Sequence, residues 1–570
     1  MAHDTAEAPA GYPHGARATH EVINQVPALA GHDVAADQAL LTAVTAQDAA
    51  WVLPELHELG RTAGSAEAIE LGRLANQHEP VLRSHDRFGN RIDEVEFHPA
   101  WHQLMATAVR HGLHAAPWAS DRPGAHVARA AKFYVWTQAE AGHGCPISMT
   151  YAVVPSLRHA PELSARYEPL LTAGDYDPVL RQPDTKPGLL AGMAMTEKQG
   201  GSDVRANSTT AVPAGDGSYL ITGHKWFCSA PMCDIFLVLA QTTEGLSCFM
   251  LPRVLPDGSR NAMRLQRLKD KLGNRSNASA EVEYDSAVAW PVGEPGRGVA
   301  TIIEMVSSTR LDCLTGSAAG IRQVAVEAAH HTGHRQAFGR LLIDQPAMTA
   351  VIADLALESE AATALAFRLV GAADRAARGD AAEAALLRLA LPAAKHWVCK
   401  RAPAVTAEAL ECLGGNGYVE ESVLPRLYRD APVNSVWEGS GNVTALDLLR
   451  AIGRSPGSLE ALRAELDLSA GADHRLDRAV AALWRELADV AAADPAAAQY
   501  QARRLTGMLT VTLQAALLVR HGPAAVSDAF CATRLGETGG LGGPGQPFGI
   551  LPGGLDLPAL VERVTPASTR

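Results

Sequence analysis

Cysteine is scarce in this chain of 570 residues, and long hydrophobic runs are missing. The eight cysteines are spread from Cys145 to Cys531 without a Cys-x-x-Cys pair, which excludes a disulfide framework and a cysteine-based zinc site. No stretch of about 18 apolar residues occurs, so we expect no membrane span. The first 20 residues mix charged and small residues without an apolar run, which argues against a secretory signal. These absences together indicate a cytoplasmic protein with free thiols.

A net positive charge is missing as well. The chain carries 50 Lys and Arg against 62 Asp and Glu, a net charge of −12. An acidic particle is not attracted as a whole to nucleic acid or to anionic membrane, although a local basic patch can still form. The composition, 47% hydrophobic and 20% charged, is that of a globular protein large enough for about two to four domains.

Composition and the spacing of apolar residues divide the chain into five regions. Residues 1–34 are rich in Pro, Gly, Ala and His and predict an arm, whereas residues 35–190 place apolar residues at helical spacing. Short β-type runs separated by turn residues predict a compact β-domain over residues 191–295. Helical periodicity returns over residues 296–450, and residues 451–570 add a further helical module with a Gly- and Pro-rich tail. The predicted fold class is therefore α+β.

Prolines and a glycine predict helix limits in the second helical region. Pro346 suits the first turn of a helix, and Gly379 suits a helix stop. Pro392 and Pro403 lie inside the next helical pattern. A proline ring has no N–H group and crowds the preceding turn, so we expect that helix to kink or break.

Two motifs lie where the first helical region meets the β-domain. Residues 195–204 read Met-Thr-Glu-Lys-Gln-Gly-Gly-Ser-Asp-Val, a loop whose glycines and hydroxyl groups can approach a flat or anionic ligand closely. Residues 223–229 read Gly-His-Lys-Trp-Phe-Cys-Ser, an aromatic strand that could form the wall of a flavin site. Each has an ordinary alternative, a simple turn for the first and a core strand for the second.

Two further motifs lie in the second helical region. Residues 335–340 read Arg-Gln-Ala-Phe-Gly-Arg and are followed by Gln345, which puts an arginine, an aromatic ring and an amide at a helix end. Residues 411–417 read Glu-Cys-Leu-Gly-Gly-Asn-Gly. No strand precedes them, and Glu420 stands where a dinucleotide fingerprint needs its third glycine. A nicotinamide-binding Rossmann domain is therefore not expected.

The remaining candidates for a catalytic or metal-binding role are one isolated carboxyl group and a pair of histidines. Residues 436–442 read Val-Trp-Glu-Gly-Ser-Gly-Asn and set Glu438 apart among small and aromatic residues. Such an acid is a candidate base, although a single loop Glu is more often a solvated surface group. His330 and His334 lie four apart on a predicted helix, but no third ligand is evident, so we expect no metal site.

In their order and spacing, these five motifs resemble the acyl-CoA dehydrogenase superfamily over residues from about 100 to 450. Residues 71–76 (Leu-Gly-Arg-Leu-Ala-Asn) and 97–102 (Phe-His-Pro-Ala-Trp-His) extend the likeness to its AidB-type branch, flavoproteins of the alkylation response. The resemblance implies a helical N-terminal domain, a middle β-domain, a C-terminal helical bundle and the extra helical module. It also implies a homotetramer.

The resemblance implies that the chain binds FAD. Met195 and Thr196 would lie near the pyrimidine edge of the flavin, and Ser202 near the pyrophosphate. Phe227 stands where the family usually has Trp, and Ser229 where it has Thr. Across the dimer interface, Arg335, Phe338 and Gln345 would meet the adenosine and pyrophosphate, and Glu411, Gly414 and Gly415 would contribute from the same partner. The other implied cofactor residues are Gly201, Ser440 and Asn442. Glu411, Ser440 and Asn442 stand in place of the usual Gln, Thr and Gln.

The resemblance also implies the chemistry. Glu438 matches the base that takes the α-proton of an acyl thioester, while the cofactor accepts the β-hydride. That proton is too weakly acidic for a free carboxylate, so the base must sit dry and close to it. In some branches the base precedes the arginine that Arg310 matches, but Thr309 occupies that position here. Arg310 itself would lie near the acyl pocket.

Two functions stay open from the sequence: an FAD-dependent acyl-CoA dehydrogenase, and a flavin-containing DNA-binding protective protein with only residual dehydrogenase activity. Residues 451–570 would bind the DNA, but they contain 11 Arg and no Lys against 12 Asp and Glu, a formal charge of −1. Arg475, Arg478 and Arg485 share one side of a predicted helix with Glu486. We therefore expect at most weak, sequence-independent duplex binding that disappears with salt.

Overall fold

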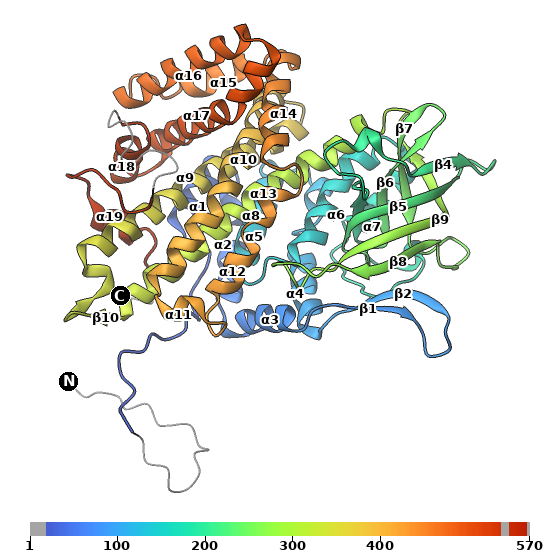
Figure 1. Cartoon of the computed structure of the whole chain (residues 1–570), viewed down its shortest axis with the longest axis horizontal. Helices are drawn as coiled ribbons and strands as arrows, with labels where there is room; N and C mark the ends of the chain where they lie inside the picture. The colour runs from blue at the N-terminus through green and yellow to red at the C-terminus, as the bar shows by residue number, and fades with distance from the viewer. Residues whose placement is uncertain (1–18, 537–546, 567–570) are drawn as a thin grey trace.

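The computed structural model describes residues 19–536 and 547–566 (Figure 1). Long helices form the body of the molecule, the β-domain lies at one end of this body, and the C-terminal helices stack on its upper side in the view. Among the described residues, no helix combines the length and the apolar character that crossing a membrane requires.

The N-terminal region consists of helices and one β-hairpin. The strands β1 (Val81–His85) and β2 (Arg91–Glu96) pair antiparallel, a hairpin that the helical periodicity of residues 35–190 does not predict. Both strands are largely exposed or half-buried, so they lack the apolar alternation of a core strand. The helices are α1 (Gln38–Ala46), α2 (Leu53–Ala63), α3 (Ala66–Gln77), α4 (Pro99–Arg110), α5 (Ala125–Trp136), α6 (Gly144–Leu157) and α7 (Pro161–Leu171).

Seven strands form the β-domain: β3 (Ala191–Ala194), β4 (Thr210–Pro213), β5 (Tyr219–Ser229), β6 (Ile235–Thr242), β7 (Gly245–Pro252), β8 (Met263–Leu268) and β9 (Ser279–Val292). They follow the order β3-β6-β4-β5-β9-β7, and β6 also pairs with β7, so the sheet closes on itself. β8 extends the sheet beside β9. Buried residues such as Ile221, Phe236, Phe249 and Val282 form its core.

Three long helices form the bundle that follows: α8 (Gly298–His334), α9 (Pro346–Ala377) and α10 (Ala381–Cys412). α9 begins at Pro346 and ends just before Gly379, whose φ of +95° is the left-handed conformation typical of a helix stop. Both predicted limits of this helix are confirmed. The hairpin β10 (Gln336–Ala337) and β11 (Arg340–Leu341) connects α8 to α9.

The expectation that Pro392 and Pro403 break the next helix is wrong. α10 runs through both prolines without a break. An interior proline costs about 3 kcal/mol or more because it removes a hydrogen bond and crowds the turn before it. α10 packs against α8, α9, α14 and α17, and this tertiary packing outweighs the local cost.

The chain then returns through short helices to the C-terminal module. These are α11 (Gly415–Tyr418), α12 (Leu424–Asp430), α13 (Val433–Val436) and α14 (Gly441–Arg454), followed by α15 (Ser458–Asp467), α16 (His474–Ala492), α17 (Pro495–His521), α18 (Ala524–Arg534) and α19 (Leu557–Glu562). Short 3₁₀ helices complete the connections: η1 (Ala50–Val52), η2 (Ala116–Ala119), η3 (Pro183–Thr185), η4 (Val204–Ala206) and η5 (Leu342–Asp344).

Buried ion pairs join the C-terminal module to the bundle. Glu465 of α15 lies 2.6 Å from Arg368 of α9 and also pairs with Arg520 of α17. Arg534 of α18 pairs with Glu358 of α9 at 3.0 Å. The module is therefore packed firmly on α9 of the bundle.

Candidate active site

The candidate base Glu438 lies on a loop between α13 and α14 whose backbone is held by two cationic side chains. Lys395 Nζ donates hydrogen bonds of 2.7 Å to the carbonyl oxygens of both Trp437 and Gly439, and Arg310 Nε donates one of 2.7 Å to the carbonyl of Glu438. Glu438 has a φ of +57°, a left-handed conformation that costs about 1–2 kcal/mol. The three bonds offset this strain and fix the direction of the carboxylate.

The Glu438 side chain is partly buried. Its Oε2 accepts a hydrogen bond of 2.8 Å from Thr309 Oγ1. Burial raises the pKa of Glu438, and the Thr309 hydrogen bond and the charges of Arg310 and Lys395 cancel only part of that rise. A carboxylate with a raised pKa is a stronger base than one in water, provided that the pH keeps it ionised.

Arg310 is held on its other side by a second carboxylate. Its NH1 lies 2.7 Å from Asp447 Oδ2 on α14, and Arg388 lies 2.9 Å from the other oxygen of Asp447. Both Arg310 and Asp447 are buried. The structure therefore places Arg310 as a link between α8, α14 and the loop, and its hydrogen bond to Glu438 goes to the backbone carbonyl.

Cys145 of the N-terminal region lies close to Glu438 and links it to polar side chains of the β-domain. Cys145, in the first turn of α6, is within electrostatic reach of both Glu438 and Lys271 and lies near Ser229 at the end of β5. Burial raises the pKa of the Cys145 thiol to about 11 and lowers the pKa of Lys271 to about 8. Lys271 Nζ donates to the carbonyl of Asn277 at 2.5 Å. The helical N-terminal region, the β-domain and the Glu438 loop thus meet at one site.

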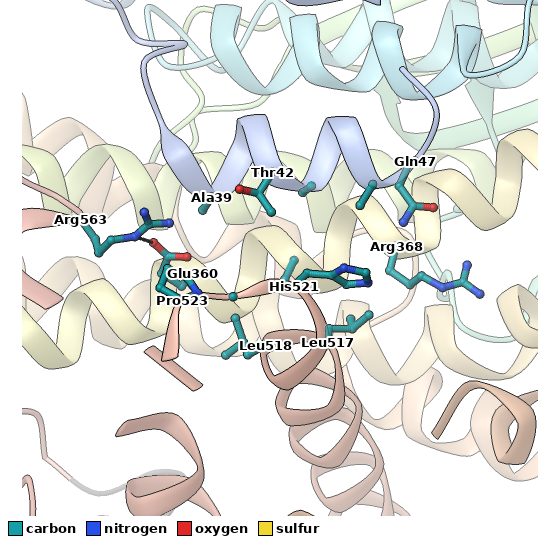
Figure 2. A pocket seen from close by; sticks show the side chains of 14 residues that line it. Ala39, Thr42, Gln47, Glu360, Arg368, Leu517, Leu518, His521, Pro523 and Arg563 are labelled. Carbon is teal, nitrogen blue, oxygen red and sulfur yellow. Dashed lines mark hydrogen bonds and ion pairs between the residues drawn. The ribbon is translucent and has the colours of Figure 1, made fainter. Parts of the chain in front are cut away.

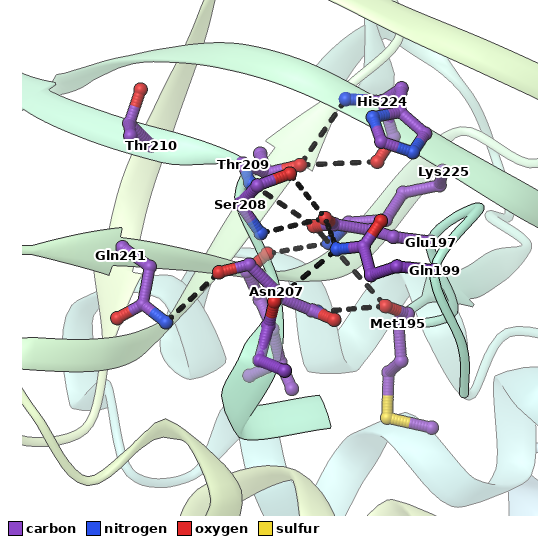
Figure 3. Close-up of polar contacts among 12 residues, drawn as sticks. Met195, Glu197, Gln199, Asn207, Ser208, Thr209, Thr210, His224, Lys225 and Gln241 are labelled. Carbon is purple, nitrogen blue, oxygen red and sulfur yellow. Dashed lines mark hydrogen bonds and ion pairs between the residues drawn. The ribbon is translucent and has the colours of Figure 1, made fainter. Parts of the chain in front are cut away.

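A buried ion pair organises the glycine-rich loop that follows β3 (Figure 3). Lys225 Nζ lies 2.8 Å from Glu197 Oε1, and both side chains are fully buried. The backbone N–H groups of Ser208 and Thr209 donate to Glu197 at 2.7 and 3.2 Å. Burial alone would raise the pKa of Glu197, but Lys225 and these hydrogen bonds hold it well below its usual range. A carboxylate inside the motif thus fixes the loop.

The same loop is tied to the aromatic strand β5. Trp226 donates its backbone N–H to the carbonyl of Thr196 at 2.8 Å, and Asn207 Nδ2 donates to the carbonyl of Met195 at 2.9 Å. The next residue, Phe227, is 51% exposed although its ring is apolar. A flat aromatic group such as an isoalloxazine ring would cover this surface. The residues present here therefore fit a flavin.

The remaining predicted residues of this half lie beside the same loop. Gly201 and Ser202 are exposed at its tip. A Cβ at Gly201 would lie 2.5 Å from Thr196 Oγ1, so the close approach requires glycine. Ser229 Oγ lies 3.2 Å from Ser279 Oγ across the pair β5 and β9.

A second group of predicted cofactor residues lies at the C-terminal ends of α8 and α10: Arg335, Phe338, Gln345, Glu411, Gly414 and Gly415. α8 and α10 run parallel because α9 turns back between them, so these residues gather at one end of the bundle. At 1.5 Å per residue, α8 carries the chain about 36 Å from Arg310 to His334.

The two predicted residues after Glu438 lie at the start of α14. Ser440 is the N-cap residue of this helix, and its side chain makes no capping hydrogen bond. Asn442 Oδ1 accepts a hydrogen bond of 2.8 Å from Arg503 Nε on α17. The extra C-terminal module therefore contacts the start of α14 directly, a link that the sequence motifs do not indicate.

Family descriptions match the chain in the order of its domains. Residues 24–178 match the N-terminal domain of the adaptive response protein AidB, residues 192–287 the acyl-CoA dehydrogenase middle domain, and residues 296–453 the acyl-CoA dehydrogenase C-terminal domain. AidB of Escherichia coli (strain K12) is 46% identical over 526 residues, which are 92% of this chain and 96% of that protein. The chain belongs to the acyl-CoA dehydrogenase family.

Solved structures of related proteins share the fold of this chain. Caenorhabditis elegans ACDH-11 in complex with C11-CoA has a TM-score of 0.81 at 27% identity, over 92% of this chain and 94% of that one. The apo form of Bd2924 has a TM-score of 0.79 at 28% identity, over 88% of this chain and 100% of that one. The predicted fold class is confirmed, and the protein is an FAD-dependent oxidoreductase.

A cavity in another part of the protein is too small to be the reaction site. It lies between α1, α9 and α17 (Figure 2) and has a volume of about 30 Å³. That is the space of about one water molecule. The ion pair of Glu360 and Arg563, 2.6 Å long, lies at its edge.

The histidine pair noted in the sequence makes contacts with backbone carbonyls. His330 Nε2 lies 2.9 Å from the carbonyl of Pro27, and His334 Nδ1 lies 2.8 Å from the carbonyl of His330. Within the described ranges, no group of three or more His, Cys, Asp or Glu side chains is arranged to hold a metal ion. The cysteines, all within these ranges, are free thiols.

The sequence motifs assign no role to Lys225, which lies inside the aromatic motif, or to Lys395, which lies outside all five motifs, although both lysines hold the site together. Lys395 lies in the run Leu-Pro-Ala-Ala-Lys-His-Trp-Val, and Lys225 lies in the aromatic strand. A lysine among apolar residues is rarely buried unless its ammonium is paired. An isolated lysine inside such a run was therefore the available signal.

Proposed function

We propose that this family member is an acyl-CoA dehydrogenase in which Glu438 removes the α-proton of an acyl thioester. The main support is the state of the carboxylate, which is partly buried, has a raised pKa and lies on a loop that Lys395 and Arg310 hold at three carbonyl groups. A weakly acidic C–H group requires such a base, because a mobile hydrated carboxylate cannot be aimed at it.

The reaction breaks two C–H bonds and forms one C=C bond. Glu438 takes the α-hydrogen as a proton, and bound FAD supplies the acceptor for the β-hydrogen with its electron pair. Thr309 donates to the ionised carboxylate and, since a hydroxyl group also accepts, it can keep this contact after Glu438 is protonated. Arg310 and Lys395 keep the loop backbone in place through both states.

The substrate that we propose is an acyl-CoA. The related ACDH-11 of Caenorhabditis elegans is solved with C11-CoA. In the present chain, a hollow of about 370 Å³ lies between the adjoining ends of β6 and β7 and the N-terminus of α8, and Arg205 and Arg297 line it. Two guanidinium groups beside a helix N-terminus favour anionic groups such as the phosphates of CoA.

We further propose that a second copy of the chain completes each cofactor site, within a homotetramer. Arg310, beside the Glu438 loop, and His334, beside the second group of cofactor residues, lie about 36 Å apart along α8, which supports a neighbouring chain as the source of one group. Large apolar side chains are exposed near the end of the bundle that carries the second group, with Phe338 at 97% and Tyr418 at 82% exposure. Contact with another copy would bury such side chains.

A flavin-containing DNA-binding protein is the alternative function, and the charges of the C-terminal module do not favour it. Arginines of this module pair with carboxylates: Arg475 with Asp473 and Asp528, Arg504 with Glu486, Arg520 with Glu465, Arg534 with Asp354 and Arg563 with Glu360. Counterion-driven binding needs cations that can meet phosphates. We propose only weak duplex binding through residues 451–570, and the link to alkylation damage rests on the similarity to AidB.

An anaerobic screen of acyl-CoA thioesters tests the proposed activity. The purified protein carrying FAD is mixed with acyl-CoAs of different chain length and branching, and the flavin absorbance is followed. We expect at least one of them to bleach the flavin in the absence of any other reductant. A flavin that dithionite reduces but that no acyl-CoA bleaches would contradict the proposal.

A further inference from the structure

The cofactor hairpin, residues 335–341, is too small to keep its shape alone. Its strands pair through two residues each, Gln336 opposite Leu341 and Ala337 opposite Arg340. An isolated two-stranded hairpin is at best marginally stable in water, even at ordinary length. Contacts from outside the hairpin must therefore fix the residues that it carries.

The turn of the cofactor hairpin is strained. Phe338 has a φ of +52° and Gly339 a φ of +76°, the pattern of a tight turn that prefers Asn-Gly. A phenylalanine is sterically disfavoured in this left-handed region, and its ring is 97% exposed. Such strain persists where the surroundings over-determine the backbone, and strained positions concentrate at ligand-binding sites.

Asn24 of the N-terminal arm binds the outer edge of β10. Its Nδ2 donates to the carbonyl of Gln336 and its Oδ1 accepts from the N–H of Gln336, both at 2.8 Å. One side-chain amide thus makes the pair of hydrogen bonds that a residue of a third strand would make. The carbonyl of Asn24 also accepts a hydrogen bond from the guanidinium of Arg335.

The arm itself is anchored near Asn24. The carbonyl of Pro27 contacts His330 Nε2 near the end of α8 at 2.9 Å, and the N–H of Gly31 donates to the carbonyl of Gly64 at 2.7 Å. Asn24 has a φ of +57°, which asparagine tolerates better than most residues. The anchored arm therefore holds Asn24, and through Asn24 the cofactor hairpin, in a defined position.

We propose that Asn24 is a positioning residue for FAD: it sets the cofactor hairpin and the Arg335 guanidinium in the geometry that meets the adenosine and pyrophosphate of the cofactor held by the partner subunit. This inference rests on the proposed function, which gives Arg335 its cofactor role. An arginine has five N–H donors in a fixed fork. The carbonyl of Asn24 accepts from one nitrogen of the Arg335 guanidinium, which leaves the remaining N–H donors of that guanidinium to meet the cofactor.

Variants of the full chain separate positioning from a general effect on the fold. Asn24→Gly removes the amide but keeps the left-handed backbone accessible. We expect it to raise the dissociation constant of FAD about tenfold, as the loss of one or two hydrogen bonds would. Gln25→Ala is the matched control, since the Gln25 amide bonds the carbonyl of Ile23 within the arm at 3.1 Å. This control should bind FAD like the wild type.

The measurements are a fluorescence titration of the apoprotein with FAD and the melting temperature of the apoprotein, which Asn24→Gly should leave unchanged. Arg335→Ala and the double variant complete the set, and in the Arg335→Ala background the glycine substitution should add much less than tenfold. Wild-type affinity in Asn24→Gly, or the same loss in Gln25→Ala, overturns the inference even when Arg335→Ala loses FAD. If Arg335→Ala binds FAD like the wild type, the proposed cofactor role of the hairpin fails as well.

Discussion

Replacing Thr309 by valine removes the hydroxyl group that donates to Glu438 and leaves a side chain of similar shape. This hydroxyl stabilises the ionised carboxylate, so its loss should raise the pKa of Glu438 beyond the rise that burial already causes. A hydrogen bond to a charged group contributes about 1.5–3 kcal/mol. At about 1.4 kcal/mol per pKa unit, that corresponds to roughly one to two units. Because Glu438 is only partly buried, we expect about one unit.

The pH dependence of flavin reduction by an acyl-CoA, measured anaerobically, reports this shift. Glu438 must be ionised to accept the proton, so the rate falls as the pH drops through its pKa. In Thr309→Val this acid limb should move to higher pH by about one unit. Thr315→Val is the matched control, because the Thr315 hydroxyl bonds the carbonyl of Leu311 within the same helix at 2.9 Å. An acid limb that stays in place, or that moves to lower pH, would refute the reasoning.

Three further predictions concern stability, assembly and DNA. Lys225→Met should lower the free energy of unfolding by about 3–5 kcal/mol at neutral pH, because Glu197 is left buried without its partner; equal denaturant midpoints would contradict this. The pKa of Glu197 lies below its ordinary value of 4.5, so the stabilisation from the pair is full above that pH and should be lost as the pH falls through the folded-state pKa. Arg335→Ala should lower FAD content and shift the gel-filtration profile toward smaller species, and no change in either would argue against a shared cofactor site. Fluorescence anisotropy should show duplex DNA binding that is weak and absent near physiological salt; tight binding that survives salt would reveal a basic surface formed between subunits.

Local signals in the sequence were sufficient for much of the architecture. Alternating apolar runs between turn residues predicted the β-domain, and Pro346 and Gly379 predicted the limits of α9. These signals act within a few residues, through proline at a first turn and glycine in a left-handed conformation. They hold here because the tertiary structure does not oppose them.

The failures have two physical causes, the packing of one element against distant segments and the exposure of another. Pro392 and Pro403 stay within α10 because neighbouring helices surround it. The hairpin of β1 and β2 is mostly exposed or half-buried, so it has no strong apolar period to detect. Neither effect can be calculated from the residues inside the element itself.

For the candidate site, the sequence pointed to the residues but not to what holds them. Glu438 stood out by its neighbours and by resemblance, whereas its support by Lys395 and Arg310 joins segments more than forty residues apart along the chain. The contact of Arg503 with Asn442 also joins distant segments, and that of Asn24 with Arg335 spans more than three hundred residues. Single hydrogen bonds between distant segments leave no periodic trace in a sequence.

The role of Glu438 is tested most directly by anaerobic stopped-flow absorbance of Glu438→Gln beside the wild type, with an acyl-CoA that bleaches the wild-type flavin. The amide has nearly the shape of the carboxylate, so the variant should keep its FAD, yet it cannot accept the α-proton. We predict that flavin bleaching slows by a factor of at least about 10² to 10⁴, the usual contribution of a positioned base. Equal rates of bleaching in the two proteins, at equal FAD content, would contradict the assignment of Glu438 as the base.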